Sequence, residues 1–250
     1  MDVISYGTIQ GEPKKLIKHD NDSVYIGKVS YNESIHRCYI KKLRIGLVIH
    51  EYIGAKFAQA IGLEVPKPII AKWNDQIVFC SVQENKFTLA FGLSEEVPID
   101  VRNKVASDFL SWGNLNLAAC FDELIYNPDR SKGNILIDFN GVVSVIDHAF
   151  SFIHDKNKIN SQNFLMNLVV ANQAVSTESQ KQELLRTLDA TTSQLLKIPY
   201  VEIFNSLSKE NLILETRSQE LVEYTECRLR QLKLFLSDHL KTSQSDFMYA

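Results

Sequence analysis

Three oxygen-bearing side chains fall within a short stretch in the middle of the sequence. Asp129 lies in a proline-containing turn, Asn134 follows it by five positions, and Asp147 stands thirteen positions further on. Phosphoryl transfer needs one carboxylate to orient the attacking hydroxyl and two oxygen ligands to hold Mg²⁺ on the nucleotide phosphates. The residue types and their spacing therefore predict Asp129 as the catalytic carboxylate and Asn134 and Asp147 as the metal ligands.

A β-hairpin must bring the two metal ligands together. The Asn-Gly pair at 140–141 lies between two β-rich runs and is the strongest short-range signal for a type I′ hairpin turn. A two-residue turn there would pair Ile135 with Ile146. One step further along, Asn134 would face Asp147, with Cβ atoms about 4.5–5.5 Å apart. The alternative is an ordinary surface hairpin whose polar end residues cap turns.

Short strands are expected before this stretch. Residues 13–43 contain three apolar runs separated by polar clusters at 19–22 and 31–34, a pattern typical of hairpins. Residues 76–82 predict one further strand. The N-terminal part of the chain is therefore expected to be β-rich.

One helix should interrupt these strands, and helices should dominate the rest of the chain. Apolar residues at helical spacing predict a helix from about Leu47 to Ile61. Gly62 should end it, because glycine readily adopts the left-handed conformation found after helices. From about Asp100 onward the pattern is mainly helical apart from the hairpin. The predicted fold class is α+β, with a small β-rich part that includes one helix and a larger, mostly α part.

The composition is that of a globular protein. The chain has 250 residues, of which 45% are hydrophobic, and a formal net charge of −3. This apolar content can offset the entropy of ordering the chain, so disorder is excluded. No run approaches the roughly 18 apolar residues of a membrane helix, and the net charge argues against a surface that coats nucleic acid. Because the first residues lack the features of a signal peptide, the expected location is the cytoplasm.

Four cysteines are scattered through the sequence without a C-x-x-C pair. Two lie in strand-like runs and two in helix-like runs, and their spacing is not that of a zinc site. We therefore expect buried thiols rather than disulfides or zinc ligands. The residues are Cys38, Cys80, Cys120 and Cys227.

The segment from Asp129 to Asn134, D-R-S-K-G-N, resembles the catalytic and metal-binding loops of the HipA-like kinases. This family belongs to the protein-kinase-like superfamily and is related to the phosphatidylinositol 3/4-kinase-like catalytic domains. A second match is H-E-Y-I at 50–53, followed by G-L-E-V-P at 62–66. It resembles the HipA-like helix that carries a lysine-pairing glutamate and ends in a G-L-x-V-P turn. The resemblance covers about residues 16–150.

The resemblance implies a two-lobed kinase fold that binds ATP and Mg²⁺ between its lobes. Residues 1–85 would form the β-rich nucleotide-binding lobe, and residues 86–250 the α-rich catalytic lobe. The stretch from Phe79 to Gln83, with Ser81 at its centre, would be the hinge beside the adenine.

A lysine on the strand before the predicted helix would grip the α- and β-phosphates and be aligned by Glu51. The run C-Y-I-K-K at 38–42 resembles the kinase strand that ends in this lysine, and we assign the role to Lys41. Lys42 is the alternative, because neighbouring strand residues face opposite sides and only one of the two can reach the phosphates.

The implied function is ATP- and Mg²⁺-dependent phosphorylation of Ser or Thr on a protein substrate, as in a toxin-like kinase. An antitoxin-like or regulatory protein would be its partner, and direct nucleic-acid binding is not expected. Two alternatives stay open: a small-molecule or lipid kinase of the same fold, and a non-catalytic pseudokinase that binds a nucleotide or a partner. The intact set of Asp129, Asn134 and Asp147 argues against the pseudokinase.

Overall fold

A closed five-stranded β-barrel forms the N-terminal part of the computed structural model, which describes residues 4–18, 23–173 and 177–246. The strand order is β1-β2-β3-β5-β4, and β1 closes the barrel by pairing in parallel with β4. The turn predicted at 19–22 lies outside the described residues. The strands are β1 (Tyr6–Lys18), β2 (Ser23–Tyr31), β3 (Ser34–Lys42), β4 (Pro68–Trp73) and β5 (Gln76–Val82).

Alternation along β3 decides which side chains enter the barrel core, because successive strand residues point to opposite faces. Ile40 is fully buried within the core, whereas its neighbours Tyr39 and Lys41 lie on the other face. β3 pairs with β5 so that Tyr39 is opposite Ser81 and Lys41 is opposite Phe79. These four residues therefore share one face, which points away from the barrel core.

Two tight turns of the barrel have the left-handed backbone of type I′ hairpins, although neither contains glycine. Asn32 and Glu33, in the turn predicted at 31–34, have φ angles of 47° and 61°. Asn74 and Asp75, between β4 and β5, have φ angles of 48° and 61°. Type I′ turns require positive φ at both central residues, and Asn and Asp tolerate this conformation better than most side chains.

The hairpin between β7 (Ile135–Ile137) and β8 (Val143–Val145) departs from the predicted register. Ile135 pairs with Val145 rather than with Ile146, so the prediction is wrong by one residue. Asn134 accepts a hydrogen bond at its carbonyl oxygen from the Ile146 N–H at 3.1 Å. Direct opposition across the strand ladder is therefore not what places Asn134 and Asp147 relative to each other.

The side chain of Asp138 explains the change of register. Its Oδ1 accepts hydrogen bonds from the backbone N–H groups of Asn140 at 2.8 Å and Val142 at 2.9 Å. The Gly141 N–H donates to the Asp138 carbonyl at 3.1 Å, and Gly141 has a φ of 80°. Asp138 thereby holds a longer loop that ends in a left-handed glycine, instead of the two-residue turn expected from Asn-Gly.

The predicted helix is α1 (Ile45–Ala60), and Gly62 follows it with a φ of 82°, as expected. Residues 48–58 are buried on all sides of the helix. The reason is that β4 and β5 pack on one side of α1 and α7 (Tyr200–Lys209) packs on another. This close packing holds the side chains of α1 in fixed positions.

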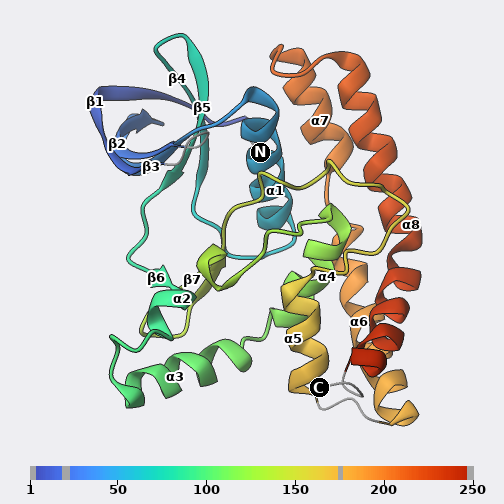
Figure 1. The fold of residues 1–250 in the computed structure, drawn as a ribbon. Helices are drawn as coiled ribbons and strands as arrows, with labels where there is room; N and C mark the ends of the chain where they lie inside the picture. The colour runs from blue at the N-terminus through green and yellow to red at the C-terminus, as the bar shows by residue number, and fades with distance from the viewer. Residues whose placement is uncertain (1–3, 19–22, 174–176, 247–250) are drawn as a thin grey trace.

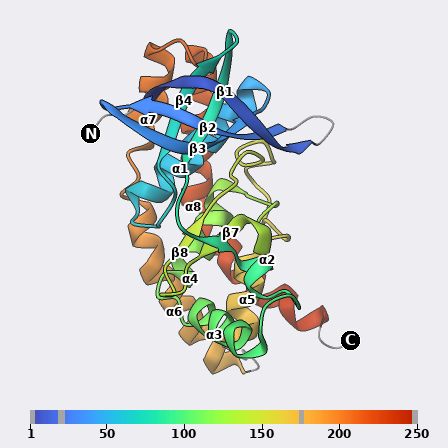
Figure 2. The same cartoon turned by 90° about the vertical axis from the view of Figure 1, so that its left-hand side faces the viewer.

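A small sheet and a group of helices make up the rest of this mixed α+β fold. Figures 1 and 2 show the barrel and α1 at one end, α3 and α6 at the other, and β7 between them. α8 runs along the side and contacts α4, α5, α6 and α7. The remaining elements are β6 (Phe87–Thr88), α2 (Leu89–Gly92), α3 (Ile99–Leu110), α4 (Leu115–Ile125), α5 (Phe164–Asn172), α6 (Glu178–Leu195) and α8 (Glu215–Asp246).

Two predictions from composition concern the cysteines and the helices. All four cysteines are free thiols, as expected, and three are buried; Cys227 is partly exposed. In the described ranges, none of the helices combines the length and the apolar character that crossing a bilayer would require.

Candidate active site

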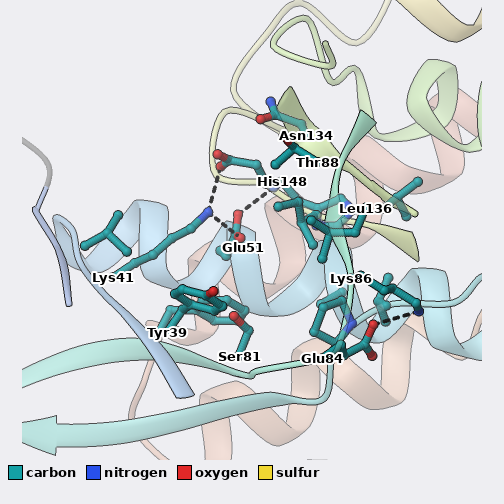
Figure 3. A pocket seen from close by; sticks show the side chains of 18 of the residues that line it. Tyr39, Lys41, Glu51, Ser81, Glu84, Lys86, Thr88, Asn134, Leu136 and His148 are labelled. Carbon is teal, nitrogen blue, oxygen red and sulfur yellow. Dashed lines mark hydrogen bonds and ion pairs between the residues drawn. The ribbon is translucent and has the colours of Figure 1, made fainter. Parts of the chain in front are cut away.

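A cavity of about 430 Å³ lies where the barrel, α1 and the small sheet meet. The outward face of β3 and β5 lines it together with residues of α1 and of the β7–β8 hairpin. Figure 3 shows Lys41 and Glu51 at one end and Glu84 and Lys86 at the other. Of the residues predicted from sequence, the cavity is lined by Lys41, Glu51, Phe79, Ser81, Asn134 and Asp147.

Lys41 is held between two carboxylates. Its Nζ lies 2.9 Å from Oε1 of Glu51 and 3.0 Å from Oδ1 of Asp147. Strand alternation sends Lys42 the other way, where its ammonium group lies 5.6 Å from the centroid of the Trp73 ring. Of the two candidate lysines, Lys41 is the one that the structure places in the cavity.

Burial and neighbouring charges shift the pKa values of Lys41 and Glu51. Burial alone would lower the pKa of Lys41, but the carboxylates of Glu51 and Asp147 raise it above its usual value. Burial raises the pKa of Glu51, while the Lys41 ammonium and the His148 N–H act against this. Lys41 therefore carries a positive charge. Glu51 is buried away from water, and its negative charge depends on the Lys41 ammonium and the His148 N–H.

Backbone geometry, rather than the strand ladder, points Asp147 into the cavity. Asp147 has a φ of 66°, the left-handed conformation that non-glycine residues rarely adopt. Two contacts hold this kink: Asn127 Nδ2 donates to the Asp147 carbonyl at 3.2 Å, and the His148 N–H donates to Oε2 of Glu51 at 2.5 Å. Asp147 and Asn134 thus both line the cavity, although the hairpin register differs from the predicted one.

Asn134 is fixed by a bond to the residue that begins the predicted catalytic loop. Its Nδ2 donates to the Asp129 carbonyl at 2.7 Å, which leaves the amide oxygen as the atom that can face a cation. The Asp129 N–H in turn donates to Oδ1 of Asn127 at 3.3 Å. Partial burial and the nearby Asp147 charge raise the pKa of Asp129, against the effects of Arg130 and Lys41.

Two predicted site residues do not line the cavity. Asp129 is one, although its carboxyl is near enough to Asp147 for that charge to act on it. Gln83 is the other; its backbone N–H donates to the carbonyl of Arg37 in β3 at 2.8 Å. Asp129 is exposed and is not part of the cavity lining, and Gln83 lies in the stretch that leaves the barrel.

A buried arginine that the sequence analysis gave no role joins the two strands of the hairpin. The Arg130 guanidinium is bidentate on Asp122 of α4, with N–O distances of 2.8 and 2.9 Å. It also donates to the Asn134 carbonyl at 3.0 Å and to the Ile146 carbonyl. Both side chains are almost fully buried. The available signal was the acidic pair Asp122-Glu123 in the mostly apolar sequence of α4, together with an arginine beside Asp129.

A second polar cluster, also absent from the sequence analysis, closes the far end of the cavity. Lys86 Nζ donates to Oε2 of Glu84 at 2.7 Å and to Oγ of Ser144 at 2.5 Å. Ser144 Oγ lies 3.2 Å from the same Glu84 oxygen. The cluster ties the stretch after β5 to β8 and so fixes the cavity wall opposite Lys41 (Figure 3).

Replacing Gly54 with Ala should loosen the contact that aligns Glu51. The added Cβ would overlap Cβ of His148 and lie 2.7 Å from its Cγ, so α1 or the segment after Asp147 must move. We expect the free energy of unfolding to fall by about 1–3 kcal/mol, the usual cost of overpacking. Urea denaturation can measure it. Gly46→Ala on the same helix is the control, because its Cβ meets nothing within 4 Å; equal stabilities of the two variants would contradict the prediction.

Comparison with known structures gives the same overall fold. The Helicobacter pylori proinflammatory kinase CtkA aligns with a TM-score of 0.58 and 12% identity, covering 94% of this chain and 96% of that one. HipA of Shewanella oneidensis MR-1, solved with HipB and its operator DNA, aligns with a TM-score of 0.50 and 13% identity, covering 93% of this chain and 68% of that one. At these identities the likeness concerns the fold alone.

Comparison of sequences identifies the family. No curated protein matches the chain. The family description "HipA-like kinase" matches residues 32–226, which include the barrel strands β3 to β5, α1, the hairpin and most of the helices. This match spans well over half of the sequence, and it contains every residue that lines the cavity except Leu16 and Val24. The chain belongs to the HipA-like kinase family.

Proposed function

We propose that this protein is an ATP- and Mg²⁺-dependent kinase that phosphorylates Ser or Thr of a protein substrate in the cytoplasm. The observation that carries the proposal is the double ion pair of Lys41 with Glu51 and Asp147, in a cavity that Asn134 also lines. Phosphoryl transfer is catalysed mainly by positioning and charge neutralisation, and this arrangement places a fixed cation beside two oxygen donors.

The two lobes of the proposed kinase are residues 1–85 and 86–250. The first would contain the barrel and α1, and the second the small sheet and the remaining helices (Figure 1). Phe79 and Ser81 both line the cavity; Phe79 is opposite Lys41 in the ladder, and Ser81 lies two residues further along β5, toward the junction. The nucleotide base would lie on the side of Ser81, with the phosphates toward Lys41.

Asp147 and Asn134 are the residues that would hold Mg²⁺. A carboxylate and an amide oxygen are the hard donors that this ion prefers, and the bond from Asn134 Nδ2 to the Asp129 carbonyl presents the amide oxygen as the donor. Mg²⁺ supplies neutralisation of charge on the β- and γ-phosphates when it is bound. Lys41 would bind the α- and β-phosphates, and Glu51 would keep its ammonium aimed at them.

Asp129 would orient the acceptor hydroxyl and take its proton. Asp129 is exposed, so a substrate could reach its carboxyl, while Asn127 and Asn134 hold its backbone in place. A carboxylate in this role contributes roughly 10²–10⁴-fold to the rate. The Asp129→Asn variant would therefore keep the nucleotide site and lose most of the transfer.

The rate of transfer should fall at low pH through protonation of Asp129. The base acts only when it is deprotonated, so activity is present above its pKa and lost below it. Because burial and Asp147 raise this pKa above the ordinary value of 3.8, the loss should begin at a higher pH than for an exposed aspartate. A profile of kcat/KM against pH measures this. The residual rate of Asp129→Asn is the control, and an identical acidic limb in both proteins would argue against the role.

Incubation of the full chain with γ-labelled ATP tests the proposed function. We expect ATP to be consumed only when Mg²⁺ is present, and mass spectrometry to find phosphate on Ser or Thr, either of the chain itself or of an added protein. Label found only on small alcohols or lipids would instead support the alternative kinase classes. A melting temperature raised by ATP without any turnover would show a pseudokinase and contradict the proposal.

We also propose an antitoxin-like or regulatory protein partner. The support is the likeness in fold to HipA, which was solved in complex with HipB and operator DNA. Affinity purification of the tagged chain from its own cells, followed by mass spectrometry, would identify such a protein; recovery of the chain alone would contradict it.

A further inference from the structure

Asn160 is a fully buried side chain in the segment that leads from Asp147 to α5. Its Nδ2 donates to the Asn127 carbonyl at 2.9 Å, and its backbone N–H donates to Oε1 of Glu123 on α4 at 3.0 Å. Its amide oxygen is buried and has no hydrogen-bond partner among the described residues. An unpaired buried oxygen costs free energy, so the bond made by the nitrogen, rather than packing, accounts for an asparagine at this position.

Asn127 carries this contact to the proposed catalytic groups. Its side chain is also fully buried; Oδ1 accepts from the Asp129 N–H at 3.3 Å, and Nδ2 donates to the Asp147 carbonyl at 3.2 Å. Its backbone N–H donates to the Asp122 carbonyl of α4 at 2.9 Å, and its carbonyl accepts from Asn160. Asn160 therefore holds one side of a residue whose side chain fixes the backbone of both the proposed base and the proposed metal ligand.

The other partner of Asn160, Glu123, is anchored by α8. Its Oε1 lies 2.7 Å from Nη2 of Arg228, and its Oε2 lies 2.7 Å from Nε2 of His239. Burial alone would raise the pKa of Glu123, but these partners and the Asn160 N–H hold it below its usual value. Arg228 also donates to the Lys158 carbonyl, so the segment that contains Asn160 lies against α8 (Figure 1). The far end of the link is thus a charged, buried and well-paired cluster.

We propose that Asn160 is a positioning residue for phosphoryl transfer. It ties Asn127 to the buried cluster of α4 and α8, and so fixes the relative positions of the proposed base and the proposed metal ligand. This inference rests on the kinase function proposed above and adds a residue to its site. A misplacement of about 1 Å can cost roughly 100-fold in rate. Because Asn160 does not line the cavity, its contribution should appear in kcat rather than in nucleotide binding.

Asn160→Ala and Asn163→Ala form a matched pair. Asn163 is equally buried in the same segment, and its Nδ2 also donates to a carbonyl of α4, that of Ala119, at 2.9 Å. Its Oδ1 accepts from the Met166 N–H at 3.0 Å, so neither of these side-chain bonds involves Asn127. In turnover of γ-labelled ATP with Mg²⁺, Asn160→Ala should lower kcat at least about tenfold and keep KM for ATP within about twofold. Asn163→Ala should keep both within about twofold, although both variants lower the melting temperature.

A double-mutant cycle tests the route of this effect. If Asn160 acts through Asn127, then Asn127→Ala lowers kcat at least as much, and adding Asn160→Ala to it lowers kcat no further. Losses that multiply would overturn the route. Asn160→Ser, whose shorter side chain removes the same bond at a smaller loss of polarity, repeats the test if Asn160→Ala is too unstable to assay.

Hydrogen exchange gives a readout that needs no ATP. The bond to Asn127 protects the Asp129 N–H, so the peptide 127–134 should exchange faster in Asn160→Ala than in the wild type and in Asn163→Ala. Unchanged exchange of this peptide would overturn the link itself.

The outcomes separate this inference from the proposed function. An equal loss of kcat in Asn160→Ala and Asn163→Ala would show a general loosening of the segment and overturn the inference. Wild-type kcat in Asn160→Ala would also overturn it, and both results would leave the kinase function intact. A wild-type chain without turnover would overturn the kinase function and with it the positioning role.

Discussion

Replacing Asp147 with Asn should lower kcat for phosphoryl transfer by about 10³-fold or more. The substitution keeps the shape of the side chain but removes the charge that pairs with Lys41 at 3.0 Å and that would hold Mg²⁺. Amide oxygens cannot neutralise a metal–phosphate complex as a carboxylate does, and this type of electrostatic stabilisation is usually the largest single contribution to catalysis. The measurement is steady-state turnover of labelled ATP at saturating Mg²⁺.

The fold should survive this change, because Asp147 is 31% exposed and the Lys41–Glu51 ion pair remains. We expect the free energy of unfolding to change by no more than about 1 kcal/mol. Asp75→Asn is a matched control: it makes the same chemical change in an exposed turn between β4 and β5. Transfer by Asp147→Asn at the rate of Asp75→Asn would remove Asp147 from the proposed site.

Replacing Arg130 with Met should have the largest effect on stability. It would leave the Asp122 carboxylate buried without its bidentate partner, a situation that typically costs about 3–5 kcal/mol. It would also remove the donor to the Asn134 and Ile146 carbonyls, which joins the two strands beside the proposed metal ligands. Urea denaturation followed by circular dichroism measures the loss.

The double variant Asp122→Leu, Arg130→Met separates the two effects. With both charges gone, no uncompensated ion is buried, and most of the stability should return. Activity should stay low, because the hairpin carbonyls still lack their donor. The single control is Arg186→Met on α6, which is 80% exposed and should change stability by less than about 1 kcal/mol. An Arg130→Met protein as stable as this control would refute the structural role.

Local patterns in the sequence were enough to predict the helix α1, its end at Gly62 and the β-rich start of the chain. These features depend on contacts within a few residues. The resemblance to a kinase strand assigned the proposed phosphate-binding role to Lys41, but the local pattern did not exclude Lys42. The choice depends on which face of β3 enters the barrel core, and that is settled by the pairing of β3 with β5, about forty positions away.

The wrong hairpin register and the missed Arg130–Asp122 pair also depend on side-chain contacts that the sequence pattern does not show. The Asn-Gly pair at 140–141 predicted a two-residue turn. Instead a longer loop forms, because the Asp138 carboxylate accepts hydrogen bonds from two of its N–H groups. Arg130 and Asp122 stand only eight positions apart, yet their pairing becomes visible only when α4 and the hairpin are packed together. Two cavity-lining elements, α1 and the segment after β8, are joined by a hydrogen bond between residues 97 positions apart.

That last bond has a consequence for control of the protein. One oxygen of the Glu51 carboxylate meets the Lys41 ammonium, and the other meets the His148 N–H, next to Asp147. A displacement of α1 that moves the Glu51 carboxylate would act on both contacts, and so on both the proposed phosphate-binding lysine and the backbone beside the proposed metal ligand. Because β4, β5 and α7 cover α1, a change in the packing of these elements could act on both parts of the site without reaching the cavity.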